Sequence, residues 1–96
     1  MANTYGNLGL IYRVKGDLDK AEQMHRKSLE IDEKLGRIEG MASDYGNLGV
    51  IYEERGDLKK AKENWEKARD LFKKIGMPRE VKLVEEWIDQ MMNDYQ

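Results

Sequence analysis

The sequence predicts an all-α protein, and three observations carry the prediction. The chain has 96 residues, of which 38% are charged and only one is proline, a composition that suits amphipathic helices better than strands. A block of sequence recurs with a period of 40 residues, and apolar residues follow helical spacing within each copy. Glycines fall where these helical patterns end. We therefore expect a right-handed superhelical stack of antiparallel helix hairpins: two repeat units plus a C-terminal capping helix, five helices in all.

The repeat emerges when the sequence is shifted against itself by 40 positions. The pentapeptide Tyr-Gly-Asn-Leu-Gly at residues 5–9 recurs at residues 45–49, and the Gly-Asp-Leu of residues 16–18 recurs at residues 56–58. A match of this length indicates a structural unit rather than chance. The predicted organisation is a first repeat over 1–36 with a shortened first helix, a second repeat over 37–76, and a capping helix over 77–96.

Each unit is expected to form two helices joined by a Gly-Asp turn. In the second unit the first helix should run from about Ile38 to Arg55, and the second from about Leu58 to Ile75. Gly accepts the left-handed conformation that ends a helix, and the following Asp can accept a hydrogen bond from the free amides of the next helix. The glycines predicted to end helices are Gly16, Gly36, Gly56 and Gly76.

Glycines also lie inside the predicted first helices, where each costs about 1 kcal/mol relative to Ala. We expect the missing side chains to let a neighbouring helix approach closely. These glycines are Gly6, Gly9, Gly46 and Gly49, with Gly40 near a helix start. A buried stripe at i, i+3, i+4 spacing is predicted for Leu8, Ile11 and Tyr12, and for Leu48, Ile51 and Tyr52.

The last 20 residues contain no copy of the repeat signature. Pro78 suits the first position of a helix, where its missing N–H is no loss. One face of this helix carries Val81, Val84, Trp87, Ile88 and Met91. We expect it to cover the second repeat, because helical arrays need a terminal cap with a polar outer side.

The repeat resembles the tetratricopeptide repeat (TPR) family. Its consensus of Leu-Gly-x2-Tyr, then Ala, an aromatic residue and a second Ala is matched by Leu48, Gly49, Tyr52, Ala61, Trp65 and Ala68. The first repeat keeps Leu8, Gly9, Tyr12 and Ala21, but has His25 at the aromatic place and Ser28 at the second Ala place. Neither unit has the consensus Pro near the end of its second helix. The 40-residue period is similar to the long repeats of kinesin light chains and of Leu-Gly-Asn scaffold proteins.

The resemblance implies a concave groove, lined by the first helices, that binds an extended or helical segment of a partner protein. Position by position, the implied groove residues are Asn3, Asn7, Leu10, Arg13 and Val14 in the first repeat, and Ser43, Asn47, Val50, Glu53 and Glu54 in the second. Asn7 and Asn47 resemble an asparagine ladder that holds a peptide backbone, since a carboxamide both donates and accepts. The alternative is that both are solvated surface residues. The charged groove residues would favour particular partner charges.

A second reading is a purely structural, self-assembling unit. Because Met1-Ala2 aligns with Met41-Ala42, residues 37–40 have no counterpart in the first unit, and we expect a segment of a longer array. The uncovered face of the first repeat would then be apolar enough to form a homodimer, with helix exchange as a further alternative. Burying about 500 Å² there would contribute on the order of 12 kcal/mol before association costs.

Composition and motifs argue against other functions. The 19 acidic and 17 basic residues give a net charge of −2, and no basic half suggests a nucleic-acid partner. No apolar run approaches the roughly 18 residues of a membrane span, and the absence of cysteine fits a reducing, cytoplasmic location. We expect no enzyme, cofactor or metal site. The single histidine, His25, is expected to pack in the core.

Overall fold

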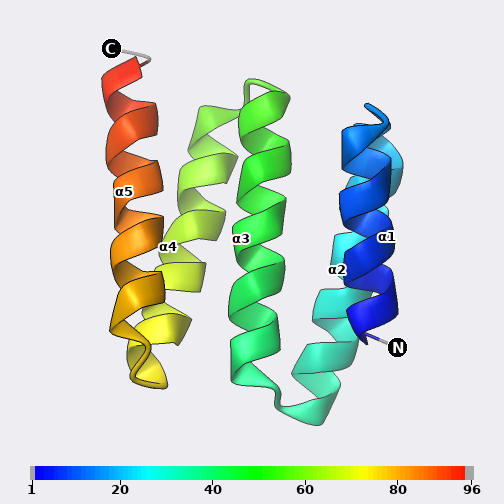
Figure 1. The fold of residues 1–96 in the computed structure, drawn as a ribbon, viewed down its shortest axis with the longest axis horizontal. Coiled ribbons are helices and arrows are strands. Elements are labelled where there is room, and N and C mark those ends of the chain that lie inside the picture. The colour runs from blue at the N-terminus through cyan, green and yellow to red at the C-terminus, as the bar shows by residue number, and fades with distance from the viewer. Residues whose placement is uncertain (1, 95–96) are drawn as a thin grey trace.

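The chain forms five α-helices in two layers in a computed structural model that describes the backbone of residues 2–94 and the side chains of residues 4–94 (Figure 1). The helices are α1 (Ala2–Val14), α2 (Leu18–Leu35), α3 (Ile38–Glu54), α4 (Leu58–Lys74) and α5 (Pro78–Asp94). One layer holds α1, α3 and α5, and the other holds α2 and α4. The all-α prediction is confirmed, and α3 and α4 each end one residue earlier than predicted.

The predicted Gly-Asp turns are confirmed in both units. Gly16 and Gly56 have positive φ angles of 84° and 82°, which only glycine adopts without strain. The Oδ1 atoms of Asp17 and Asp57 each accept a hydrogen bond at 3.1 Å from the backbone N–H three residues later. These caps satisfy amides that the first turn of a helix leaves free. The same short sequence therefore ends one helix and begins the next.

Two interior glycines admit a bulky side chain from the second helix of their own hairpin. A Cβ at Gly9 would lie 2.6 Å from Nε2 of His25, and a Cβ at Gly49 would overlap the indole of Trp65. Real Cβ atoms do not come this close to other heavy atoms. The expected close approach is confirmed at both positions, and it sets the spacing of the two helices in each hairpin.

The same expectation is wrong for Gly6 and Gly46. Their nearest neighbours would be 3.9 and 4.0 Å from a Cβ, which is ordinary van der Waals contact. Gly40 is tighter, because a Cβ there would lie 2.5 Å from a carboxylate oxygen of Asp32 on α2. This glycine therefore matters for the junction between the two hairpins.

The same lysine–tyrosine contacts occur within each of the two hairpins. The distances from Nζ to the ring centroid are 5.5 Å for Lys20–Tyr12 and for Lys60–Tyr52, 5.6 Å for Lys27–Tyr5, and 5.4 Å for Lys67–Tyr45. Each pair lies within the range of a cation–π interaction. Of the four tyrosines only Tyr52 is buried, and each contacts a lysine on the following helix.

The main hydrophobic core lies within the second hairpin and against α5. Leu48, Trp65 and Phe72 are buried there with Val84 and Ile88 of α5. The rings of Trp65 and Trp87 pack with their centroids 6.0 Å apart. The prediction that the last helix covers the second repeat is confirmed.

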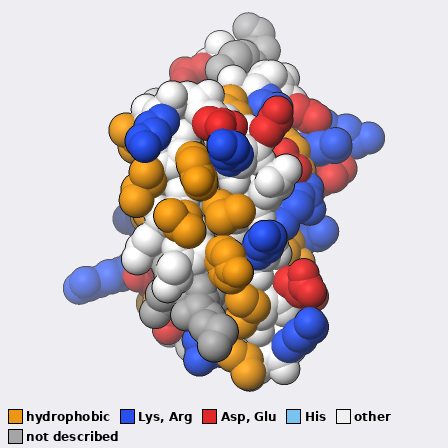
Figure 2. Space-filling view, turned by 90° about the vertical axis from the view of Figure 1, so that its right-hand side faces the viewer, with side chains coloured by type: hydrophobic (Ala, Val, Ile, Leu, Met, Phe, Trp, Pro, Cys, Tyr) orange, Lys and Arg blue, Asp and Glu red, His pale blue; other side chains and the backbone are white. Residues whose placement is uncertain are grey.

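The predicted buried stripe of the first helix is wrong at Ile11, and its other members, Leu8 and Tyr12, are only half-buried. The Ile11 side chain is 49% exposed, whereas its counterpart Ile51 is 0% exposed. The first hairpin packs against α3, while no described residue covers the corresponding side of α1. Figure 2 views the molecule from this end and shows hydrophobic side chains gathered on the uncovered face.

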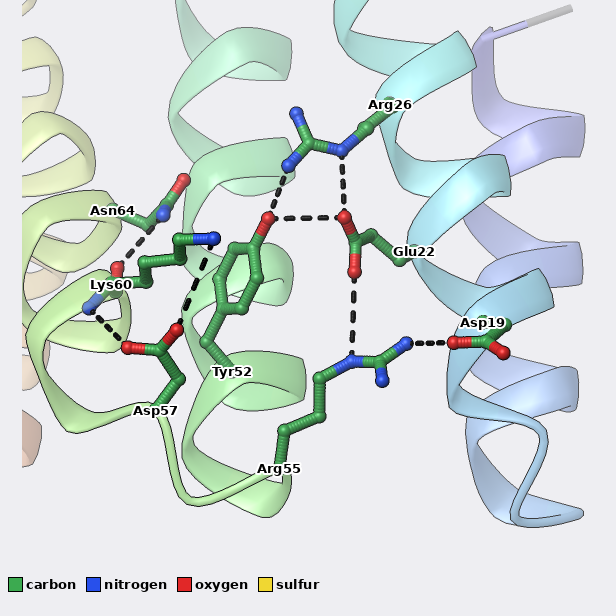
Figure 3. A network of polar contacts seen from close by, with 8 residues as sticks. All are labelled: Asp19, Glu22, Arg26, Tyr52, Arg55, Asp57, Lys60 and Asn64. Atoms are coloured by element: carbon green, nitrogen blue, oxygen red, sulfur yellow. Dashed lines mark hydrogen bonds and ion pairs between the residues drawn. The ribbon is translucent and has the colours of Figure 1, made fainter.

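A polar network joins α2 to α3 at one edge of the hairpin junction (Figure 3). The hydroxyl of Tyr52 donates to Glu22 at 3.0 Å, and Arg26 Nε donates to the same carboxylate oxygen at 2.9 Å. Arg26 also donates to the Tyr52 hydroxyl, and Arg55 pairs with Asp19 and with Glu22. The network therefore holds the first hairpin in place against the second.

Candidate functional site

A cavity of about 580 Å³ opens between α1 and α3, with α2 beneath it. Asn7 and Leu10 of α1 face Ser43 and Asn47 of α3 across this cavity. Its floor includes Ser28 and the carboxyl groups of Asp32 and Asp44. The volume lies within the usual range for small binding sites. The cavity therefore forms a depression on the face of the molecule that carries α1, α3 and α5.

Two smaller cavities extend this depression toward α5. One, of about 250 Å³, lies between α3 and α5 and shares Ser43 and Asn47 with the first cavity. The other, of about 340 Å³, is lined by Val50, Glu53 and Trp87 among other residues. The 250 Å³ cavity also shares Trp87 of α5 with the 340 Å³ cavity, so the three cavities together form one groove.

The structure places the ten residues predicted to line this face as follows. Asn7, Leu10, Ser43 and Asn47 line the first cavity, and Arg13, Val50 and Glu53 line the 340 Å³ cavity. Val14 is 83% exposed and Glu54 is exposed, and neither lines any of these three cavities. The side chain of Asn3 lies outside the described residues. Seven of the predicted positions therefore meet in one depression.

Arg13 and Glu54, both predicted to favour particular partner charges, bind each other. Arg13 Nε donates to Glu54 Oε1 at 2.8 Å and links α1 to α3. Both side chains are 36% exposed, so the pair is worth about 1 kcal/mol or less. Much of the positive charge of Arg13 is therefore already balanced within the protein.

A polar stripe on α2 was not predicted from the sequence. His25, Ser28 and Asp32 lie at i, i+3 and i+7, and all three are buried. The residues at the same repeat positions of α4 are Trp65, Ala68 and Phe72. The 40-residue alignment held this signal, because it places an aspartate where the second unit has a core phenylalanine.

Asp32 and Asp44 form a buried carboxyl pair between α2 and α3. They are 3% and 4% exposed, and the Ser28 hydroxyl donates to Asp44 Oδ1 at 2.8 Å. Burial and hydrogen bonding to the Asp32 carboxyl raise the pKa of Asp44 to about 8, against the opposing effect of the Ser28 hydrogen bond. Asp44 is thus protonated at pH 7, and a proton between the two groups allows them to be buried side by side.

His25 is fully buried, as expected for a packing residue. Neither ring nitrogen has a hydrogen-bond partner among the described residues. Burial, together with the nearby positive charge of Arg13, lowers the pKa of His25 to about 4. The imidazole is therefore neutral at physiological pH and acts there as a packing group.

Between residues 4 and 94, no three His, Cys, Asp or Glu side chains are grouped so that they could hold a metal ion. Among the five described helices, none combines the length and hydrophobicity needed to cross a bilayer.

Comparison with known proteins agrees with this architecture. The chain matches no curated protein. A family model described as tetratricopeptide repeat matches residues 1–74, which covers both helix hairpins. This match extends over more than half of the chain, and the paired helices with Gly-Asp turns are what the repeat pattern predicts. The chain therefore belongs to the tetratricopeptide repeat family.

Proposed function

We propose that this protein is a scaffold that binds an extended or helical segment of a partner protein in the groove. Tetratricopeptide repeats are typically non-catalytic and bind other proteins. The observation that carries the proposal is the cavity between α1 and α3, where Asn7 and Asn47 stand at equivalent positions of successive repeats. Neither carboxamide hydrogen-bonds to another described side chain, so both are available to a ligand. A carboxamide can satisfy a peptide unit whatever side chain that unit carries.

The groove also offers apolar surface beside these amides. Leu10 is 41% exposed in the first cavity, and Leu83 is 45% exposed in the cavity between α3 and α5. Trp87 lines both cavities next to α5. Binding sites generally combine apolar walls with a few polar groups that fix orientation. The proposed ligand is therefore a segment that carries apolar side chains on a hydrogen-bonding backbone.

The test is selection of binders from a phage-displayed library of random dodecapeptides, followed by affinity measurement on the selected peptides. Replacing Asn7→Ala and Asn47→Ala together should weaken binding by about tenfold or more, since each lost hydrogen bond contributes about 0.5–1.5 kcal/mol. The matched control is Gln23→Ala, which removes an exposed amide from α2. The proposal fails if no peptide is enriched, or if the double variant binds as tightly as the control.

We propose a non-catalytic role in the cytoplasm, supported by the absence of cysteine. The overall acidic balance argues against a nucleic-acid partner. The likeness of the period to the long repeats of kinesin light chains stays a prediction.

A second candidate is self-association through the uncovered face of α1. The exposed Ile11, whose counterpart Ile51 is fully buried, favours this reading. Hydrophobic side chains gather on this end of the molecule (Figure 2). A second copy of the chain is the proposed occupant, because a symmetric dimer needs only one kind of surface. Light scattering at high micromolar concentration should give a dimer mass, with helix exchange as one form of the dimer. Ile11→Glu should then give a monomer, and a monomeric mass for the unmodified chain would remove the idea.

A further inference from the structure

The floor of the first cavity is made of carboxyl groups that the hairpins bury but do not neutralise with a cation. Asp32 and Asp44 line the cavity although they are only 3% and 4% exposed. Apart from the proton that the pair shares, no described residue donates a hydrogen bond to the buried Asp44 Oδ2. No Lys or Arg of the described chain forms an ion pair with either carboxyl group. A positively charged ligand can therefore stabilise this buried carboxyl pair.

The groove is also acidic as a whole, although the chain is nearly balanced in charge. The acidic residues that line the three cavities are Asp32, Glu39, Asp44, Glu53, Glu80 and Asp94. The basic residues that line them are Arg13 and Arg37, and the first of these already pairs with Glu54. With 19 acidic and 17 basic residues in the chain, this surface holds a share of the negative charge well above the average. Charge complementarity therefore points to a positively charged occupant.

From this arrangement we infer that the groove selects a basic segment of its partner and seats one lysine or arginine side chain on the Asp32–Asp44 pair. The inference rests on the proposed peptide-binding function and adds the chemistry of the ligand to it. The cation would replace the proton that the two carboxyl groups share in the free protein. Its positive charge would then form charge-assisted hydrogen bonds, which are stronger than neutral ones.

The cavity of about 580 Å³ beside the pair has room for such a side chain. Gly40 lines this cavity, and its missing Cβ lets the Asp32 carboxyl group lie against the backbone of α3. A Cβ at Gly40 would lie 2.5 Å from Asp32 Oδ2. The uncharged Asn7 and Leu10 form the opposite wall. An aliphatic stem could therefore lie along Leu10 while its charged end reaches the floor.

The charged groups that surround Asp44 determine how binding depends on pH. From α2 it faces Asp32 and the hydroxyl of Ser28, and α1 contributes no charged side chain to the cavity. Arg37 and Glu39, next to the start of α3, have opposite charges. Because the pKa of Asp44 is about 8, the group is protonated at pH 7, and an arriving cation releases that proton to the buffer.

The first test uses fluorescent nonapeptide libraries of mixed sequence whose central residue is fixed as Lys, Arg, Gln or Glu. The Lys and Arg libraries should bind about 10- to 100-fold more tightly than the Gln library, as expected for hydrogen bonds to charged groups. The Glu library should bind most weakly. Binding of the Lys library should tighten between pH 7 and pH 9, whereas binding of the Gln library should change little.

The second test measures proton release directly. The tightest single peptide from the Lys library is titrated by calorimetry at pH 7 in phosphate and in Tris, whose ionisation enthalpies differ. The difference between the binding enthalpies in the two buffers should correspond to about one proton released per peptide bound. Replacing the central lysine by norleucine should abolish this release and weaken binding.

Variants separate the pair from the general charge of the groove. Asp44→Asn and Asp32→Asn should each remove most of the lysine preference and the proton release. Asp70→Asn removes a carboxylate from α4 that is 66% exposed, and it should leave both unchanged. The circular dichroism spectrum of each variant checks that the helical fold is kept. Asp32→Asn and Asp44→Asn test the contribution of the carboxyl pair independently of each other.

The outcomes distinguish the inference from the function on which it rests. If the libraries bind in a way that depends on Asn7 and Asn47 but show no preference for lysine or arginine, the inference fails and the groove function stands. The inference also fails if the preference survives both asparagine variants, or if no proton is released. If no library binds at all, the inference and the proposed function fail together.

Discussion

His25 and Trp65 occupy the same place in successive hairpins, and each lies against a glycine of the preceding helix. A Cβ on Gly9 would clash with the imidazole, and a Cβ on Gly49 would clash with the indole. The two rings differ in their polar contacts. Trp65 Nε1 donates to the carbonyl of Gly46 at 3.1 Å, whereas neither nitrogen of His25 has a described partner. The first hairpin therefore keeps the packing of the repeat but lacks its hydrogen bond.

Replacing His25→Phe should stabilise the protein at pH 7.5 by about 1 kcal/mol. A buried polar group without a partner costs about 1–3 kcal/mol, and phenylalanine keeps an aromatic ring at this position, where the second hairpin has Trp65, without that cost. Urea unfolding followed by circular dichroism measures the change. Trp65→Phe is the matched comparison, and it should destabilise the protein because it removes an existing hydrogen bond. A less stable His25→Phe variant would show that the ring nitrogens have partners in solution.

The advantage of His25→Phe should grow as the pH falls. The pKa of His25 is lowered from 6.5 to about 4, so between these values the unfolded chain binds a proton that the folded chain does not. Stability from neutral His25 is complete above pH 6.5 and is lost as the pH falls toward 4, by at most about 1.4 kcal/mol per pH unit. Phenylalanine cannot titrate. A stability difference that stays constant from pH 7 to pH 4 would contradict the burial of a neutral imidazole.

Asp44→Asn should change the pH dependence in the opposite direction. The pKa of Asp44 is raised from 3.8 to about 8, so in this window the folded chain binds a proton that the unfolded chain does not. Unfolding free energy therefore falls as the pH rises from about 4 to 8, by at most about 1.4 kcal/mol per pH unit. The asparagine variant should become progressively more stable than the unmodified chain across this range.

The pH dependences of the unfolding free energy that are due to His25 and to Asp44 overlap, and this overlap provides an internal check. Between pH 4 and pH 6.5 the contributions of His25 and Asp44 have opposite slopes, so the unmodified chain should show little pH dependence from them. Above pH 6.5 only the loss due to Asp44 remains. Asp70→Asn, on the exposed face of α4, serves as the control and should run parallel to the unmodified chain. Parallel curves for Asp44→Asn as well would mean that this carboxyl group titrates normally.

The buried pair of Asp32 and Asp44 marks the limit of what the sequence could predict. The hairpins, their Gly-Asp turns and the glycines that admit a ring follow from local signals that recur every 40 residues. The pairing of Asp32 with Asp44 depends on how α2 packs against α3, and no local pattern encodes that contact. The alignment of Asp32 with Phe72 did show that a core position had become polar. A polar residue at a repeat position that is apolar elsewhere is thus a usable signal for a buried network.

In the groove, too, the repeat positions predicted some features, whereas others depend on contacts between helices. The family resemblance, carried over by the repeat register, was enough to place Asn7 and Asn47 beside one cavity, because equivalent positions of stacked hairpins face the same side. It was not enough for Arg13 and Glu54, which are 41 residues apart in sequence and pair across α1 and α3. Ile11 was misplaced for a related reason, since burial at a repeat position requires a neighbouring hairpin.

Alanine substitutions at two glycines of α1 should have opposite effects. Gly9→Ala should destabilise the protein by about 1–3 kcal/mol, because its Cβ would lie 2.6 Å from the buried imidazole. Gly6→Ala meets its nearest atom at 3.9 Å and should stabilise the helix by up to about 1 kcal/mol. Thermal unfolding of both variants gives the comparison within one helix. Equal effects at the two sites would contradict the packing of α1 on α2.

The network at the hairpin junction predicts a difference between two equivalent tyrosines. Tyr52→Phe removes the hydroxyl that donates to Glu22 at 3.0 Å and accepts from Arg26, so it should destabilise the protein by about 1–2 kcal/mol. Tyr12→Phe alters the same repeat position in α1, where the hydroxyl has no described hydrogen bond, and should be nearly neutral. Both variants retain the contact of the ring with a lysine.

Unfolding free energies of the two tyrosine variants, measured at low and high salt, distinguish the junction from the hairpin itself. The loss caused by Tyr52→Phe should shrink at high salt, because the charged partners of the hydroxyl are partly exposed and screened by ions. The effect of Tyr12→Phe should not depend on salt. If the two substitutions destabilise the protein equally at both salt concentrations, the hydroxyl acts within its own hairpin, and the ion-pair network does not hold α2 to α3.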